Sequence, residues 1–160
     1  MCGFAEQLHH RVHGEHILKI SVNSVFFTPA DVEILRKCLQ AREVQPGECI
    51  IQQGQPPAGL YMIERGQVSI MLECEDGSRL RLRTVGNGAF FGEMGLYTRE
   101  RATAWVIADQ PTSLYQLLAE DLDRLEETVP QVASALHLFV ATYMSERLAK
   151  MTNTVQTLMH

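Results

Sequence analysis

Long hydrophobic runs, closely spaced cysteine pairs and clusters of basic residues are all missing from this chain of 160 residues. Its apolar runs are interrupted well before the roughly 18 residues that a membrane-spanning helix needs, and the N-terminus lacks the apolar segment of a signal peptide. The 4 cysteines include no CxxC pair, which is typical of reduced thiols rather than of disulfides or metal ligands. A formal net charge of -5 argues against a nucleic-acid partner, because neutralising phosphates requires a basic surface. We therefore expect a soluble, cytoplasmic protein without direct membrane insertion.

The chain does contain enough apolar sequence for one buried core. Hydrophobic residues make up 46% of it, and its length is too short for two ordinary domains. We expect three parts of a single domain: an N-terminal helical or poorly defined segment (1–25), a helix, β-roll and short helix (26–128), and a long C-terminal helix (129–160).

The N-terminal segment is rich in histidine. His9, His10, His13 and His16 recur at near-helical spacing, and imidazoles three or four residues apart share one helix face, as a metal site requires. A solvated, partly frayed terminal helix explains the same spacing without a metal, and we favour that explanation.

A short amphipathic helix is predicted over residues 26–40. Thr28 is a suitable N-cap and Pro29 suits the first helical position. Leu35 and Leu39 belong to an apolar stripe at helical spacing. The stripe predicts that this helix packs on the segment that follows it.

Short strands are predicted between Arg42 and Leu118, separated by glycine and proline turns. The turns recur at intervals of about 8–12 residues, as in an antiparallel sandwich or barrel. The predicted strands are Cys49–Gln52, Leu60–Glu64, Val68–Glu73, Leu80–Val85, Thr103–Ala108 and Ser113–Leu118. Asp76-Gly77 supplies a tight hairpin between two of them. This pattern predicts a small antiparallel β-roll.

Side-chain orientations within two of these strands can also be predicted. Leu80-Arg81-Leu82-Arg83 alternates, so its leucines should point inward and its arginines into solvent. Trp105 fits an inward position of its strand, which favours a place in the core over a role as a base-stacking platform.

Helical periodicity returns after Leu118. A short helix is predicted over Ala119–Thr128, and Pro130 can begin a long helix whose apolar positions continue to Leu158. At about 1.5 Å per residue, that helix is longer than a small β-roll can cover. Its second half therefore forms either a helix-to-helix homodimer seam or a frayed tail.

The stretch Gly88–Ala108 contains the candidate binding site. A turn at Gly92-Glu93 followed by a few helical residues presents free backbone N–H groups beside one carboxylate, which suits an anionic, hydroxyl-bearing ligand. Glu93 also has a purely structural explanation, because it can form a surface ion pair with Arg99 or Arg101.

The chain resembles the cyclic nucleotide-binding domain family over roughly residues 26–150. The residues that carry the resemblance are Gly47-Glu48, Gly54, Leu60-Tyr61-Met62-Ile63, Gly66, Val68 and Phe91-Gly92-Glu93-Met94-Gly95-Leu96. The resemblance implies a mainly β fold with flanking helices: a jelly-roll-like antiparallel β-roll, short N-terminal helices, and a short and a long C-terminal helix. Within the family, LRLRTVGNGAFFGEMGLY and PQVASALHLFVATYMSERLA are most similar to the C-terminal domain of some bacterial SulP-type anion permeases.

The resemblance also implies roles for individual residues. In the family, backbone amides at the positions of Gly92 and Met94 contact the cyclic phosphate, and the carboxylate at Glu93 binds the ribose 2′-hydroxyl. An arginine nine positions after that glutamate pairs with the phosphate, but here the position holds Ala102, and Arg101 comes one residue early.

Arg101, Gly95 and Thr103 complete the candidate ligand-binding set. If Ala102 lies in the following strand, Arg101 points to the opposite face, because a shift of one residue exchanges the two faces. A turn tightened by one residue would instead bring Arg101 into the site. The Thr103 hydroxyl and the Gly95 backbone each suit either a ligand contact or an ordinary structural role.

These features predict a non-catalytic regulatory or sensor domain with a degenerate phosphate site. It would regulate an anion transporter-like protein, as a domain tethered at the inner membrane, or form a homodimer through the C-terminal helix. The alternative is a genuine receptor for cyclic AMP (cAMP) or cyclic GMP (cGMP) that uses Arg101 for the phosphate. An enzyme is not expected, because the sequence offers no nucleophile beside a base and no acid pair of defined spacing.

Overall fold

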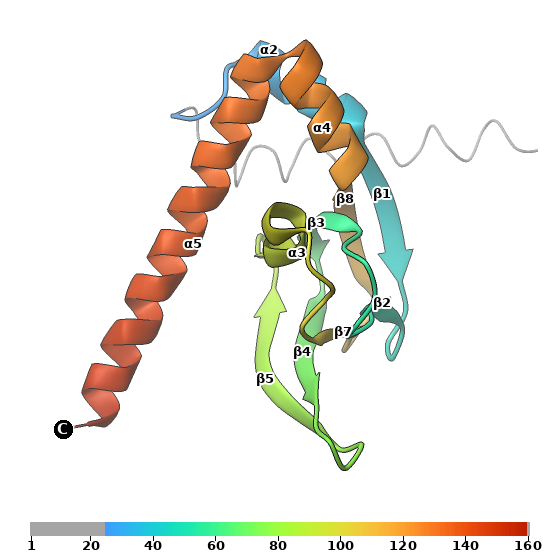
Figure 1. Cartoon of the computed structure of the whole chain (residues 1–160), viewed down its shortest axis with the longest axis vertical. Helices are drawn as coiled ribbons and strands as arrows, with labels where there is room; N and C mark the ends of the chain where they lie inside the picture. Colours follow the sequence, from blue (N-terminus) through green and yellow to red (C-terminus); the bar gives the residue numbers. More distant parts are fainter. Residues whose placement is uncertain (1–24, 160) are drawn as a thin grey trace, which may run out of the picture.

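The computed structural model describes residues 25–159, and Figure 1 shows them as a β-structure with a long helix leading away from it. The elements are α2 (Pro29–Cys38), β1 (Leu39–Val44), β2 (Cys49–Ile51), β3 (Gly59–Arg65), β4 (Gln67–Glu73), β5 (Arg79–Gly86), β6 (Phe90–Phe91), α3 (Glu93–Thr98), β7 (Trp105–Ala108), β8 (Thr112–Leu118), α4 (Ala119–Thr128) and α5 (Pro130–Leu158). His9, His10, His13 and His16 lie outside the described residues, so the two explanations of their spacing stay predictions.

Two four-stranded sheets face each other. One has the order β1-β8-β3-β6 and the other β2-β7-β4-β5, and their strand pairs are antiparallel. The predicted antiparallel β-roll with flanking helices is confirmed.

Strand β3 is buried on both faces and separates two cores. Tyr61 and Ile63 point between the two sheets, whereas Leu60 and Met62 point to the opposite face, where α2, α4 and α5 pack. Successive side chains of a strand alternate between faces, so the apolar run in β3 serves both cores. The sheet β1-β8-β3-β6 is therefore the central layer, with helices on one side and the second sheet on the other.

Helix α2 begins as predicted and ends earlier. The Thr28 side chain accepts a hydrogen bond from the backbone N–H of Asp31, and the Asp31 carboxylate accepts one from the N–H of Thr28, forming a capping box. Leu39 was predicted to lie in the helix, but it begins β1 and pairs with Leu117 of β8. Tertiary pairing overrides helical periodicity at this point, and β1 was missing from the predicted strands for the same reason.

The predicted orientations in β5 are wrong. Leu80 and Leu82 are 56% and 52% exposed, and Arg83 lies opposite the buried Ile70. The register of β4 and β5 shifts between Ile70 and Met71. Because Arg83 shares the face of Ile70, the alternation of the strand places its neighbour Leu82 on the outer face, the reverse of the predicted arrangement.

The predicted inward position of Trp105 is also wrong. Val106 and Ala108 of β7 enter the core between the sheets, so the alternation of the strand places Trp105 on the outer face, opposite Met71. There its ring is half-buried, and the Arg79 guanidinium lies 4.1 Å from the ring centroid, in the range of a cation–π contact.

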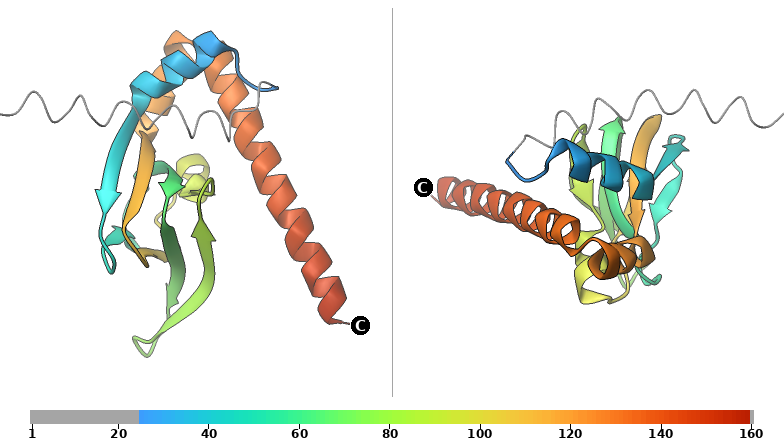
Figure 2. Two further views of the ribbon diagram at one scale, coloured as in Figure 1. Left: turned by 180° about the vertical axis from the view of Figure 1, so that it is seen from behind. Right: turned by 90° about the horizontal axis from the view of Figure 1, so that it is seen from above.

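The first half of helix α5 packs on the roll. The Phe139 ring contacts Phe26, Phe27 and Phe90 edge-on, with centroids 5.3–5.8 Å apart. Both views in Figure 2 show the C-terminal part of α5 extending away from the strands. No helix among residues 25–159 has the length and apolar character needed to cross a membrane.

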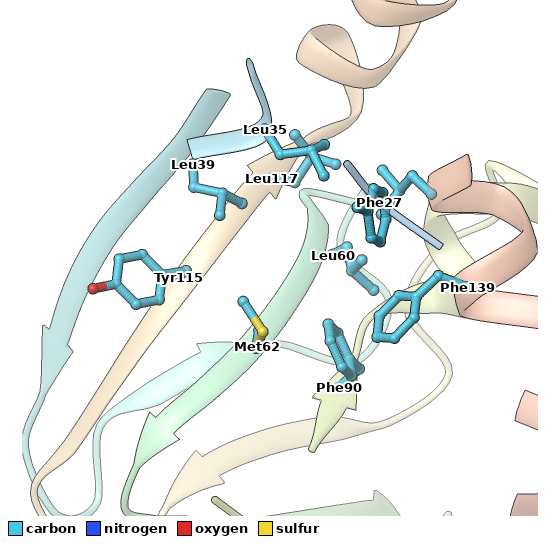
Figure 3. A pocket seen from close by; sticks show the side chains of 10 residues that line it. Phe27, Leu35, Leu39, Leu60, Met62, Phe90, Tyr115, Leu117 and Phe139 are labelled. Carbon is cyan, nitrogen blue, oxygen red and sulfur yellow. The ribbon is translucent and has the colours of Figure 1, made fainter. Parts of the chain in front are cut away.

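A small apolar cavity of about 40 Å³ lies between the central sheet and the helices (Figure 3). In this view Phe139 and Phe27 face Phe90 and Leu60 across the contact between helices and sheet. The residues around the cavity are Phe27, Leu35, Leu39, Leu60, Met62, Phe90, Tyr115, Leu117, Leu136 and Phe139. Its lining is apolar, which suits packing between helices and roll rather than recognition of a polar ligand.

Replacing Phe139 by alanine should weaken this contact. We expect Phe139→Ala to lower the free energy of unfolding by about 2–4 kcal/mol, because it removes the ring that joins α5 to Phe90 and enlarges an existing cavity. Chemical denaturation measures the change. Leu138→Ala is the matched control, since Leu138 is 59% exposed, and an equal loss in both variants would contradict the prediction.

Candidate functional site

A cavity of about 110 Å³ lies between the two sheets and α3. Its lining residues are Ile51, Ile70, Arg83, Phe91, Gly92, Glu93, Met94, Gly95, Ala102, Thr103, Ala104 and Val106. The structure thus brings together all the predicted site residues except Arg101. We call this cavity the Glu93 pocket.

The two glycines of the pocket have a structural reason to be glycine. Gly92 adopts a φ of 85°, and a Cβ there would lie 2.5 Å from the carbonyl oxygen of Gly59. A Cβ at Gly95 would lie 2.9 Å from Cβ of Pro57. Close packing of α3 against β3 and the preceding loop therefore requires both residues, whether or not their backbones contact a ligand.

Backbone pairing holds Ala102 in place. Its N–H donates to the carbonyl oxygen of Gln55 at 2.9 Å, and its own carbonyl accepts from the N–H of Gly54 at 2.7 Å. The Arg101 side chain is exposed, and its Nη1 donates to the carbonyl oxygen of Gly54 at 2.9 Å. Ala102 therefore faces the pocket, and the Arg101 guanidinium is held outside it.

Glu93 is paired with a residue that sequence reasoning missed. The carboxylate is 4% exposed, and its Oε1 accepts a hydrogen bond from Nη1 of Arg147 in α5 at 2.8 Å. Glu93 therefore does not pair with Arg99 or Arg101, and Arg99 instead pairs with Asp123 of α4. The two residues are 54 positions apart in the sequence, so no local sequence pattern could have predicted the Glu93–Arg147 pair.

Arg83 supplies a second arginine to the pocket. Its guanidinium forms no hydrogen bond or ion pair with any residue in 25–159. Burial lowers the pKa of Arg83 from its usual value, the nearby Arg147 lowers it further, and the Glu93 carboxylate opposes both effects. Arg83 and Glu93 therefore line the pocket, and Arg147 reaches the Glu93 carboxylate from α5.

Polar contacts also link α3 to the two C-terminal helices. The Tyr97 hydroxyl lies 3.0 Å from Nδ1 of His137 in α5, and Nε2 of the same ring lies 2.8 Å from Oε1 of Glu126 in α4. Burial, with a smaller effect of Glu126, raises the pKa of Tyr97 to about 12. One turn before Arg147, the Tyr143 hydroxyl accepts a hydrogen bond from the N–H of Phe90 at 3.2 Å. The position of α5 is thus tied to the pocket at several points.

Removing the guanidinium of Arg147 should destabilise the fold, because it leaves the Glu93 carboxylate buried without a partner. We expect Arg147→Met to lower the free energy of unfolding by about 1–3 kcal/mol. Lys150→Met is the control, since it removes an exposed positive charge from the same helix. Chemical denaturation at one ionic strength compares the two, and equal effects would show that net charge rather than the Glu93 contact is responsible.

The part of the chain that the structure describes offers no group of three His, Cys, Asp or Glu residues that could hold a metal ion. The lining of the Glu93 pocket combines the charged groups of Arg83 and Glu93 with the apolar side chains of Ile51, Ile70 and Val106.

Known proteins share both sequence and fold with this chain. A putative potassium channel protein from Rhodopseudomonas palustris is 33% identical over 141 residues, which cover 86% of this chain and 33% of that protein. The human potassium/sodium hyperpolarization-activated cyclic nucleotide-gated channel 4 is 28% identical over 149 residues, which cover 91% of this chain and 12% of the channel. The chain thus spans a third or less of the length of these relatives.

Solved structures agree with this likeness. A cyclic nucleotide-binding domain from Methylobacillus flagellatus superposes with a TM-score of 0.80 at 21% identity, covering 89% of this chain and 82% of that one. The catabolite activator protein of Thermus thermophilus has a TM-score of 0.64 at 27% identity, covering 81% and 61%. The family model described as "Cyclic nucleotide-binding domain" matches residues 41–128, more than half of the sequence. The chain therefore belongs to the cyclic nucleotide-binding domain family.

Proposed function

We propose that this chain is a non-catalytic regulatory domain whose pocket has lost the arginine that holds a cyclic phosphate in the family. The observation that carries the proposal is the placement of residues 101 and 102. Ala102 lines the Glu93 pocket, while the Arg101 guanidinium binds the carbonyl oxygen of Gly54 outside it.

The energetic consequence of the missing arginine is large. A guanidinium can donate two parallel hydrogen bonds to a phosphate, and each charge-assisted bond is worth about 1.5–3 kcal/mol. Loss of about 3 kcal/mol corresponds to a dissociation constant roughly 100-fold higher. The methyl group of Ala102 offers no replacement, so cAMP and cGMP should bind weakly or not at all.

The regulatory output is proposed to pass through α5. Arg147 on α5 already occupies one oxygen of Glu93, so a ligand that engages Glu93 competes with a helix contact. Ligand binding would thereby change the balance between a docked and a released α5.

The proposed target is a membrane transport protein to which this domain is tethered on the cytoplasmic side. Two relatives support this class of partner, because they are described as a putative potassium channel and as a cyclic nucleotide-gated channel. The resemblance to SulP-type anion permeases is a narrower form of the same proposal, with an anion transporter as the regulated partner.

A second copy of the chain is the other proposed partner. Leu148, Met151, Val155 and Leu158 follow one another in steps of three, four and three, and each is more than half exposed. This spacing is that of a coiled-coil seam, and it lies on the part of α5 that extends away from the roll.

Isothermal titration with cAMP and cGMP tests the degenerate site. We expect no saturable binding to the natural chain up to about 500 µM ligand, and an affinity at least about 10-fold higher in Ala102→Arg, which restores the fork of donors. Arg99→Ala is the control, because Arg99 pairs with Asp123 away from the pocket. Saturable binding that Arg101→Ala abolishes would instead establish the alternative, a genuine cAMP or cGMP receptor.

Sedimentation equilibrium tests the homodimer. The average mass should rise from the monomer value of 18.0 kDa as the concentration increases. Val155→Glu should abolish the rise by placing a charge in the apolar seam, whereas Asn153→Glu, off the seam, should not. A mass of 18.0 kDa at every concentration would remove the dimer proposal.

A further inference from the structure

We propose that Arg83 is the anion-binding residue of the Glu93 pocket, and that the pocket takes a phosphate monoester of a hydroxyl-bearing compound, such as a ribonucleoside monophosphate. In this arrangement the phosphate contacts β5 rather than the turn after α3. The inference rests on the proposed loss of the phosphate-binding arginine at position 102.

The first argument is that the Arg83 guanidinium lacks a partner. It lines the pocket and is only partly exposed, yet no acceptor within residues 25–159 binds it. Ile51, Ile70 and Val106 of the lining offer no side-chain acceptor, and the Glu93 carboxylate of the same lining pairs with Arg147 instead. A partly desolvated cation in such surroundings is stabilised by an anionic ligand.

The second argument is the charge of the pocket. Glu93 is its only acidic lining residue, and Arg147 already pairs with it. Arg83 therefore gives the pocket one positive charge that no carboxylate neutralises, although the whole chain has a formal net charge of -5. Burial and, to a smaller extent, the nearby Arg147 lower the pKa of Arg83, so an anionic ligand would stabilise its charged form.

The third argument concerns the other end of the ligand. Only Oε1 of Glu93 is engaged by Arg147, and Oε2 forms no hydrogen bond with any residue in 25–159. A free carboxylate oxygen accepts a hydrogen bond from a hydroxyl group. The apolar lining beyond it suits an aromatic or apolar substituent, so a base, a sugar hydroxyl and a phosphate each find a complementary group.

A phosphate monoester fits this arrangement better than a cyclic diester. A monoester has a second pKa near 6 and carries about −1.5 to −2 charge at pH 7, with three acceptor oxygens. A cyclic diester carries a single negative charge. Arg83 carries the excess positive charge of the pocket, and its planar fork of donors can pair with two of the three monoester oxygens.

Thermal unfolding with 5′-AMP, inorganic phosphate and adenosine tests the inference at one ionic strength, adjusted with sodium chloride. We expect 5′-AMP, at about ten times its dissociation constant, to raise the Tm by about 3–5 °C. Inorganic phosphate should raise it less, and adenosine least. The 5′-AMP shift should disappear in Arg83→Met and persist in Arg81→Met, which removes an exposed arginine of the same strand.

Arg83→Lys is a second variant in case Arg83→Met fails to fold. It keeps the positive charge but loses the planar guanidinium that can donate two parallel hydrogen bonds. It should weaken 5′-AMP binding at least about threefold. The inference is overturned if none of the phosphate-bearing probes shifts the Tm, or if the shift in both Arg83 variants equals that of the natural chain. Failure of the proposed function has a different signature: cAMP binding that Arg101→Ala removes and Arg83→Met leaves unchanged.

Discussion

A buried carboxylate is costly without a partner, and the partner of Glu93 comes from α5. The 2.8 Å contact between Glu93 and Arg147 joins the start of α3 to the long helix. The Tyr143–Phe90 hydrogen bond and the Tyr97–His137–Glu126 contacts lie around it. The same carboxylate also lines the pocket. A ligand that bound Glu93 would therefore compete with the contact that holds α5 in place. The regulatory proposal follows from this shared use.

The positive charges of the pocket are arranged differently from the family pattern. The family places an arginine at the position of Ala102. Here the backbone of Ala102 is paired with Gly54 and Gln55, which keeps the Arg101 side chain outside. The guanidinium groups near the pocket instead come from β5 and α5, as Arg83 and Arg147. This origin of the positive charge is the basis of the proposal that the pocket binds a different anionic ligand.

Much of the fold followed from local chemistry. The capping residues Thr28 and Pro29 marked the start of α2, and α4 spans Ala119–Thr128 as predicted. Strand β1 and the two-residue β6 were missed, because neither has a distinctive alternation and both exist through pairing with distant strands. Leu82 and Trp105 were assigned to the wrong faces, since the pairing of β5 and β7 with β4 fixes those faces.

The order of residues along the chain was sufficient to identify the family and the β-roll, because turn glycines, caps and motif spacing are local properties. It was not sufficient to identify the charges that surround Glu93. Arg147 is 54 residues away in sequence, and Arg83 faces the pocket because it pairs with the buried Ile70 of β4. Contacts of this kind depend on how sheets and helices pack, so the electrostatics of the pocket became visible only in three dimensions.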